Sequence, residues 1–301
     1  MIPVLSNGRI LMILFITSNS TTCMNLLLIP CLPFLAVILI PTVALKYLQK
    51  GLIITGGSDK IINVVDFDFD FVRTLIGHDG NVCCLDSRII DGELIIISGS
   101  WDKSAIIWRN FEKTITLTGH EQAIWGVKVL QNGNFLTASA DKTIKLWNGS
   151  NGVCLWTFEG HSDCVRGIQV AQDETKFYSV SNDASIKIWD MNGDCISTLY
   201  GHSSFIYALA VANDRIISVG EDKCIKVWDF KECIQTIPYP CDSIWCISIS
   251  SDGDFLVGGS DGQLRVFSSN PIKIPSLEEQ QKYSQAVASI QIQKYFFLLF
   301  S

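Results

Sequence analysis

The fold is decided by a stretch that occurs four times: residues 98–108 read SGSWDKSAIIW, residues 137–147 read TASADKTIKLW, residues 179–189 read SVSNDASIKIW and residues 218–228 read SVGEDKCIKVW. In each copy a Ser or Thr stands four positions before an Asp, and a Trp stands six positions after that Asp. Apolar residues flank a polar segment that is typical of a tight turn. Each copy therefore predicts two short β-strands joined by a turn at the Asp.

The repeat extends beyond these four copies. The dipeptide Gly-His begins at residues 77, 119, 160 and 201, at spacings of 42, 41 and 41 residues. Weaker copies of the turn surround Asp59 and Asp261. Four short strands in a unit of about 40 residues predict an all-β fold, a β-propeller, whose blades pack together because one blade cannot bury its own faces. The chain resembles the WD-repeat family, with six recognisable blades.

The resemblance to WD repeats implies a structural role for the repeated polar residues. In that family the Asp lies in the turn between the second and third strands of a blade, and the His precedes the first strand. A buried carboxylate and a buried imidazole need hydrogen-bonding partners, because unpaired they cost several kcal/mol. The implied tetrads are His78 with Ser98, Asp102 and Trp108; His120 with Thr137, Asp141 and Trp147; His161 with Ser179, Asp183 and Trp189; and His202 with Ser218, Asp222 and Trp228. The first and last copies lack the His and are expected to form the less stable blades.

The sequence favours binding over catalysis. Ser, His and Asp recur together four times, whereas an enzyme needs one such site. Residues 258–262, GGSDG, match the pattern Gly-x-Ser-x-Gly but fall in the turn of a repeat. All four His belong to Gly-His dipeptides, so none remains as a general base. We expect no enzyme, no cofactor and no metal, and a serine hydrolase using Ser260 is the weakest alternative.

Composition narrows the partners and the compartment. The 301 residues carry a net charge of −7 without a run of Lys or Arg, which argues against nucleic-acid binding. The 11 Cys are odd in number and form no Cys-x-x-Cys motif. We therefore expect reduced thiols in a cytoplasmic protein, with the nucleus as a second location. Cys154, Cys195 and Cys233 recur at one repeat position and are expected to be small buried residues.

One face of the propeller is the expected binding site. Propellers commonly bind partners on the face that carries the turns at the Asp and the loops after Gly-His. Residues before each turn Asp, or near the start of each first strand, place Trp, Tyr, Phe and Arg there, and such residues often supply the energy of an interface. An alternative is that some of them fill the channel mouth as core. The expected partner-binding residues are Trp101, Trp125, Arg166, Asn182, Phe205, Tyr207, Glu221 and Trp245.

Longer strings indicate a subfamily. TFEGHSDCVRGIQV (157–170), SNDASIKIWD (181–190) and YGHSSFIYALAV (200–211) resemble the N-terminal propeller of the phospholipase-A-2-activating protein family. The resemblance, over about residues 47–288, implies seven blades in an adaptor that binds ubiquitin or ubiquitinated proteins. It also implies work with an AAA segregase ATPase, here only indirectly, because the family's central ubiquitin-binding domain and C-terminal ATPase-binding domain have no counterpart. GLIITGGSDKIINVV (51–65) resembles the family's second blade, so its first blade has no counterpart either, as a truncated chain would explain.

The segments around the propeller differ from the family. No charged residue lies between Arg9 and Lys46, and residues 24–45 are long enough to span a bilayer, although three prolines interrupt them. A membrane anchor and an irregular leader both stay open. Without its first blade the ring exposes sheet edges, so we expect leader strands to cover them or the chain to be poorly stable. The expected organisation is a hydrophobic leader (1–45), a propeller (46–270), a short helical tail (271–294) and an apolar end (295–301).

The function expected from these observations is that of a non-catalytic, ubiquitin-binding WD-repeat adaptor in ubiquitin-dependent protein degradation and ubiquitin homeostasis. The alternative is a general WD-repeat scaffold for another protein, including one tethered to a membrane by residues 24–45. Both alternatives would use the same aromatic face, and they differ in the partner that binds there.

Overall fold

The computed structural model describes residues 42–48, 52–66, 71–212, 215–249 and 253–268, together with residues 278, 281, 282 and 285. Most of the predicted hydrophobic leader and all of the apolar end, 295–301, lie outside the described residues. The four described tail residues are helical and fall in the segment expected to form a short helix. No helix among the described residues has the length and apolar character that crossing a bilayer requires.

The described strands form six antiparallel sheets, in which strands that follow one another along the chain are paired. We call these sheets blades 1 to 6 in chain order. Blade 1 contains β1 (Thr42–Leu48), β2 (Leu52–Gly57), β3 (Ile61–Asp66) and β4 (Phe71–Ile76). Blade 2 contains β5 (Val82–Ile90), β6 (Glu93–Ser100), β7 (Ala105–Arg109) and β8 (Glu112–Leu117). Blade 3 contains β9 (Ile124–Val129), β10 (Phe135–Ser139), β11 (Ile144–Trp147) and β12 (Cys154–Phe158).

The second half of the propeller repeats this pattern. Blade 4 contains β13 (Val165–Val170), β14 (Lys176–Ser181), β15 (Ser185–Asp190) and β16 (Cys195–Tyr200). Blade 5 contains β17 (Ile206–Ala212), β18 (Arg215–Gly220), β19 (Cys224–Trp228) and β20 (Cys233–Pro238). Blade 6 has three described strands, β21 (Ile244–Ile249), β22 (Phe255–Gly259) and β23 (Leu264–Phe267).

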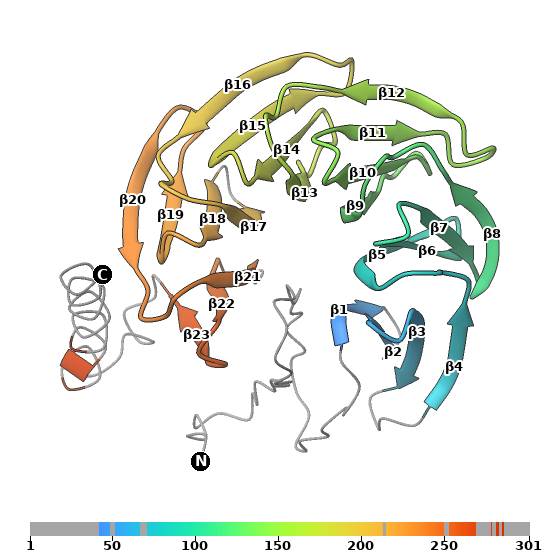
Figure 1. The fold of residues 1–301 in the computed structure, drawn as a ribbon, viewed down its shortest axis with the longest axis horizontal. Coiled ribbons are helices and arrows are strands. Elements are labelled where there is room, and N and C mark those ends of the chain that lie inside the picture. The colour runs from blue at the N-terminus through green and yellow to red at the C-terminus, as the bar shows by residue number, and fades with distance from the viewer. Residues whose placement is uncertain are drawn as a thin grey trace.

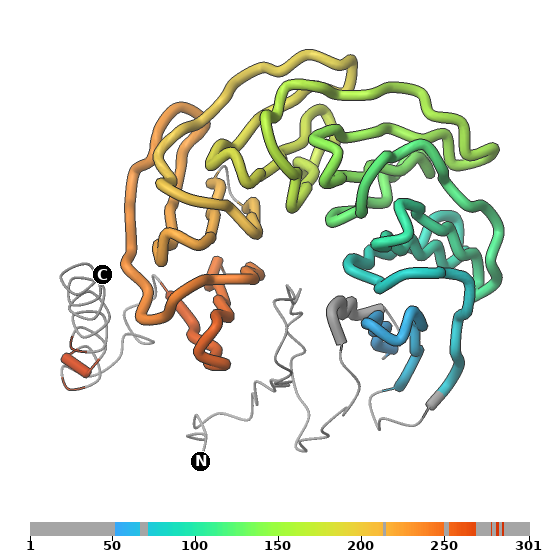
Figure 2. The backbone as a smooth tube through the Cα atoms, viewed as in Figure 1, coloured from blue at the N-terminus to red at the C-terminus, as the bar shows by residue number. Residues whose placement is uncertain are grey.

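The blades are arranged around a common centre, as the sequence predicts for a propeller. Figure 1 shows the first strand of each blade nearest the centre and the fourth strand, where one is described, on the outside. The tube in Figure 2 follows the chain outward through each blade and back to the centre for the next. Blades 1 and 6 form the two ends of the arc. The first described strand, β1, begins at Thr42, four residues before the expected start of the propeller at residue 46.

Burial differs sharply between inner and outer strands. All five residues of β10 are buried, because both faces of this strand lie against neighbouring blades. In the outer strand β12 the first three residues are exposed. The expectation that Cys154, Cys195 and Cys233 are buried is therefore wrong. Each begins an outer strand, where Cys154 and Cys195 are exposed and Cys233 is half-buried.

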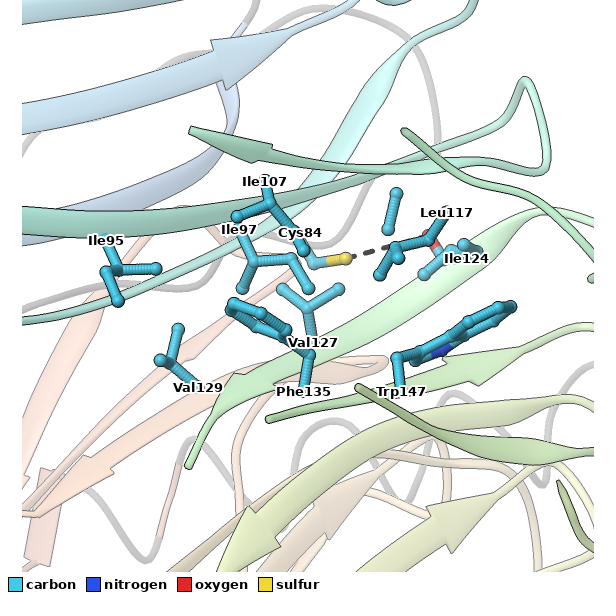
Figure 3. Close-up of a cluster of buried hydrophobic side chains, with 11 residues drawn as sticks. Cys84, Ile95, Ile97, Ile107, Leu117, Ile124, Val127, Val129, Phe135 and Trp147 are labelled. Carbon is cyan, nitrogen blue, oxygen red and sulfur yellow. Dashed lines mark hydrogen bonds between the residues drawn. The ribbon is translucent and has the colours of Figure 1, made fainter. Parts of the chain in front are cut away.

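Apolar side chains between adjacent blades form the core. Figure 3 shows the cluster between blades 2 and 3, where Ile97 and Ile107 pack against Val127, Phe135 and Trp147. Four further clusters occupy the described blades. Fully burying one such side chain contributes about 1.5–3 kcal/mol. The blades are therefore held mainly by apolar contact, which leaves the loops at the propeller face free to carry polar residues.

Candidate partner-binding site

The four tetrads implied by the repeats form hydrogen-bonded units. In blade 2, Nδ1 of His78 lies 2.8 Å from Oδ2 of Asp102, and Nε2 lies 2.7 Å from Oγ of Ser98. The Trp108 indole donates to the same Oγ over 2.9 Å. Because a carboxylate only accepts, Nδ1–H donates to Asp102, and Nε2 of the neutral imidazole then accepts from the Ser98 hydroxyl. The corresponding distances in the other three tetrads are 2.6–2.8 Å: His120 with Thr137, Asp141 and Trp147; His161 with Ser179, Asp183 and Trp189; and His202 with Ser218, Asp222 and Trp228.

Burial and hydrogen bonding set the charge of each tetrad. Burial lowers the pKa of His78 below its usual value, more strongly than the neighbouring Asp102 raises it, which favours the neutral imidazole. Burial opposes the charge of Asp102, but hydrogen bonds from Ser104, Asp79 and His78 outweigh it and lower the pKa of this carboxyl to about 2. The pKa values of Asp141, Asp183 and Asp222 are lowered in the same way. The tetrad of His78 is thus a neutral imidazole held by the carboxylate of Asp102.

The geometry of the Gly-His dipeptide also supports the tetrads. Gly160 has a φ of +150°, a conformation that side chains rarely adopt. A Cβ at this position would lie 3.2 Å from the ring of Trp189. The glycine therefore allows the chain to pass close to the tryptophan, so that His161 can reach the tetrad.

The Ser-His-Asp sets in these tetrads are closed to substrate. The hydroxyl residues Ser98, Thr137, Ser179 and Ser218 are completely buried. In the separate motif at residues 258–262, Ser260 lies in the turn between β22 and β23, where its Oγ accepts a 3.1 Å hydrogen bond from the Ser243 backbone. Within the described part of the chain, no group of three or more His, Cys, Asp or Glu side chains is arranged to hold a metal ion.

Blade 6 replaces the tetrad with a different arrangement. Tyr239 is buried, and its hydroxyl donates to the carbonyl oxygen of Val257 over 3.2 Å. The guanidinium of Arg265 lies 4.8 Å from the centroid of the Tyr239 ring and pairs with Asp261 at 2.7 Å. A tyrosine and an arginine thus connect the loop, the strand and the turn Asp where blades 2 to 5 use His. The sequence shows that blade 6 lacks the His, but it carries no signal for this replacement.

A β-bulge positions the residues nearest the centre. In the first strand of blades 2 to 6, the pairing register steps over the second residue. Such a bulge bends the strand and redirects one side chain. The residues at this position are Cys83, Trp125, Arg166, Tyr207 and Trp245. In blade 1 the register steps over Val43 in the same way, which identifies β1 as a first strand.

Residues from four blades meet on the predicted binding face. Trp101, in the turn between β6 and β7, contacts Trp125 edge to face, with ring centroids 6.0 Å apart. The guanidinium carbon of Arg166 lies 4.4 Å from the Trp125 ring centroid and 5.6 Å from that of Tyr207. Nε of Arg166 donates to Oδ1 of Asn182 over 2.9 Å. We call Trp101, Trp125, Arg166, Asn182 and Tyr207 the aromatic rim.

The other three predicted residues have different neighbours. Phe205 is 37% exposed, and its carbonyl oxygen accepts a 2.9 Å hydrogen bond from the backbone of Glu221. The carboxylate of Glu221 accepts a hydrogen bond from Ser204 over 3.0 Å. Trp245 lies in blade 6, where its indole donates to Oγ of Ser243 over 2.9 Å. Phe205 and Glu221 therefore form a pair in blade 5, and Trp245 is oriented by its own loop.

Exposed carboxylates lie within a few residues of the aromatic rim in the sequence. They were not among the predicted binding residues. Glu121 precedes Trp125 by four residues, and Asp163 precedes Arg166 by three. Both side chains are exposed in loops that lead into first strands, as is Asp79 before β5. Their signal in the sequence is their position within two residues after Gly-His. The face therefore offers aromatic surface together with negative charge.

The fold agrees with comparisons to known proteins. The family model "WD domain, G-beta repeat" matches residues 69–109, 111–148, 152–190, 193–229 and 231–268. Phospholipase A-2-activating protein of Xenopus laevis is 46% identical over 244 residues, which cover 81% of this chain and 30% of that protein. Ubiquitin homeostasis protein lub1 of Schizosaccharomyces pombe is 36% identical over 286 residues, which cover 81% of this chain and 33% of that protein.

A solved structure extends the comparison to three dimensions. The crystal structure of the WD40 β-propeller domain of Doa1 matches with a TM-score of 0.72 and 39% identity, over 78% of this chain and 81% of that one. The chain spans about a third of the length of the two curated relatives, and the match to Doa1 lies in its propeller. The chain therefore belongs to the WD-repeat family, and its propeller is the N-terminal WD-repeat domain of the phospholipase A-2-activating protein family.

Proposed function

We propose that this propeller is a non-catalytic adaptor that binds ubiquitin through the aromatic rim. The observation that carries the proposal is the continuous row formed by Trp101, Trp125, Arg166 and Tyr207 across four blades. Trp101 is 45% exposed, although contact with water is unfavourable for a large aromatic side chain. Trp, Tyr and Arg are the residues that most often dominate the energy of protein interfaces.

Ubiquitin is complementary to this face in two respects. It offers an apolar patch that is surrounded by basic residues. The tryptophans of the aromatic rim would pack on the apolar patch, and the exposed carboxylates of Glu121 and Asp163 would attract the basic residues. The apolar contact would supply most of the affinity, while the charges would orient the partner and speed its association.

The relatives support a role in the ubiquitin pathway. The name of lub1 refers to ubiquitin homeostasis, and a further relative in Caenorhabditis elegans is a ubiquitin fusion degradation protein 3 homolog. We extend this role to the present chain as an adaptor in ubiquitin-dependent degradation and ubiquitin homeostasis, acting in the cytoplasm and nucleus. We propose an AAA segregase ATPase as an indirect partner in this pathway.

A titration of isotope-labelled ubiquitin with the full chain tests the proposal. The expected result is a set of NMR shift changes confined to the apolar patch of ubiquitin and its basic surround. A folded chain that causes no shifts would contradict ubiquitin binding and favour the general WD-repeat scaffold, for which the same aromatic rim would serve another protein. Circular dichroism of the same sample shows whether the chain is folded.

A further inference from the structure

Arg166 is a cation held at the centre of the aromatic rim. It takes part in none of the ion pairs found within the described part of the chain. Four other arginines do pair with carboxylates, namely Arg73, Arg88, Arg109 and Arg265. Instead, Arg166 lies against the rings of Trp125 and Tyr207. The position therefore carries a half-buried positive charge that an anion could neutralise.

The surroundings of Arg166 fix the direction in which it can bind. Its Nε is already occupied by Oδ1 of Asn182, at 2.9 Å. The two aromatic rings restrict the plane of the guanidinium. The remaining donors are the two terminal nitrogens, whose parallel N–H groups match the two oxygens of one carboxylate. Arg166 is thus prepared for end-on contact with a carboxylate of a docked partner.

We infer that Arg166 binds the C-terminal carboxylate of ubiquitin, an inference that rests on the proposed function. The exposed carboxylates of Glu121 and Asp163 repel a surface that carries several negative charges. The group that binds Arg166 should therefore carry a single negative charge. Arg166 is half-buried and lies against two aromatic rings, which favours a slender chain end over an acidic side chain on a folded surface. A terminal carboxylate meets both conditions, because it carries one charge at the tip of an extended chain.

This inference has a consequence for the form of ubiquitin that is recognised. When ubiquitin is joined to a lysine through its C-terminus, the carboxylate becomes an uncharged amide. Such an amide cannot form the charged two-point contact with Arg166. The propeller should therefore bind ubiquitin with a free C-terminus more tightly than ubiquitin conjugated through it, and so respond to the pool of unattached ubiquitin.

The test compares two ligands and four forms of the full chain. The ligands are ubiquitin with its natural C-terminal carboxylate and ubiquitin with a C-terminal carboxamide, titrated calorimetrically at constant ionic strength. The proteins are wild type, Arg166→Gln, Arg166→Lys and the control Lys142→Gln, which removes one exposed positive charge from a turn on the same face. Thermal unfolding of each variant checks that it is folded.

Wild type and Lys142→Gln should bind the carboxylate form about tenfold more tightly than the carboxamide form. Arg166→Gln should bind both forms of ubiquitin with the same weakened affinity. Arg166→Lys should keep only part of the preference for the carboxylate form, because lysine retains the positive charge but lacks the paired N–H groups of the guanidinium. Equal binding of both forms by wild type would overturn the inference while leaving ubiquitin binding intact. If Arg166→Gln weakened both forms equally and wild type did not distinguish them, an acidic side chain would be the partner and the terminal carboxylate would be excluded. Failure of wild type to bind either form would instead overturn the proposed function, and the inference with it.

Discussion

Nε2 of His78 lies 2.7 Å from Oγ of Ser98, and both residues are buried. With Asp102 on the other side of the imidazole, the three side chains have the hydrogen-bond order of a hydrolytic triad. The hydroxyl is nevertheless engaged by the Trp108 indole and cannot meet a substrate. The same chemistry that activates a nucleophile in an enzyme here connects a loop, a strand and a turn in each of blades 2 to 5.

Replacing Ser98 with Ala should destabilise the propeller strongly. The substitution leaves the Trp108 indole N–H and the acceptor Nε2 of His78 buried without their partner. Together these losses should lower the free energy of unfolding by about 2–4 kcal/mol. Urea unfolding measures the change, with the exposed Ser150→Ala as a control. Equal midpoints for Ser98→Ala and wild type would show that the tetrad does not stabilise the fold.

Acid should destabilise the protein in two stages. The folded pKa of His78 lies below the usual 6.5, so the unfolded chain binds its proton first and the free energy of unfolding falls as the pH drops below 6.5. Asp102 has a pKa of about 2 in the folded protein against 3.8 ordinarily, so a second loss occurs between these two pH values. Urea midpoints measured from pH 7.5 to 5 test the first stage. The fall should be smaller in His78→Asn, and a rise on acidification would contradict the assignment of a neutral imidazole.

Blade 6 should depend on Tyr239 as blades 2 to 5 depend on His. Tyr239→Phe removes the hydrogen bond to the Val257 carbonyl and should cost about 1 kcal/mol. The loss should be local, so amide hydrogen exchange in β21, β22 and β23 should become faster than in blade 3. Tyr200→Phe, at an exposed site, provides the control. Unchanged exchange in blade 6 would mean that apolar packing alone holds it.

The thiols should differ in reactivity according to strand position. Cys154 and Cys195 begin outer strands and are exposed, whereas Cys84 is buried between blades and its pKa is raised by burial. Iodoacetamide should therefore label Cys154 and Cys195 in the folded protein well before Cys84, as peptide mass spectrometry would show. After unfolding in urea all three should react. Early labelling of Cys84 in the native protein would contradict the packing of blades 2 and 3.

The sequence predicts the tetrads well because their spacing is set by strand geometry. In blades 2 to 5 a turn Asp and a Trp six residues later share one His, so the resemblance to WD repeats carries over directly to His161, Asp183 and Trp189. The exposed thiols were missed because an apolar pattern does not distinguish an outer strand from an inner one. The stacking of Arg166 on Trp125 depends on a β-bulge, and the bulge shows no residue signature of its own. The role of Tyr239 was missed for a related reason. The repeat spacing shows where a His is expected, but it does not show which other residue takes its place.

The most direct test of the central claim is calorimetric titration of ubiquitin into the wild-type chain, Trp125→Ala and Trp156→Ala. Trp125 contacts both Trp101 and Arg166 in the aromatic rim, while Trp156 is 49% exposed on the outer strand β12. The account predicts that Trp125→Ala weakens binding by about 2 kcal/mol or more, that Trp156→Ala binds like wild type, and that all three proteins are folded. Wild-type affinity in folded Trp125→Ala, or an equal loss in Trp156→Ala, would contradict the aromatic rim as the ubiquitin site.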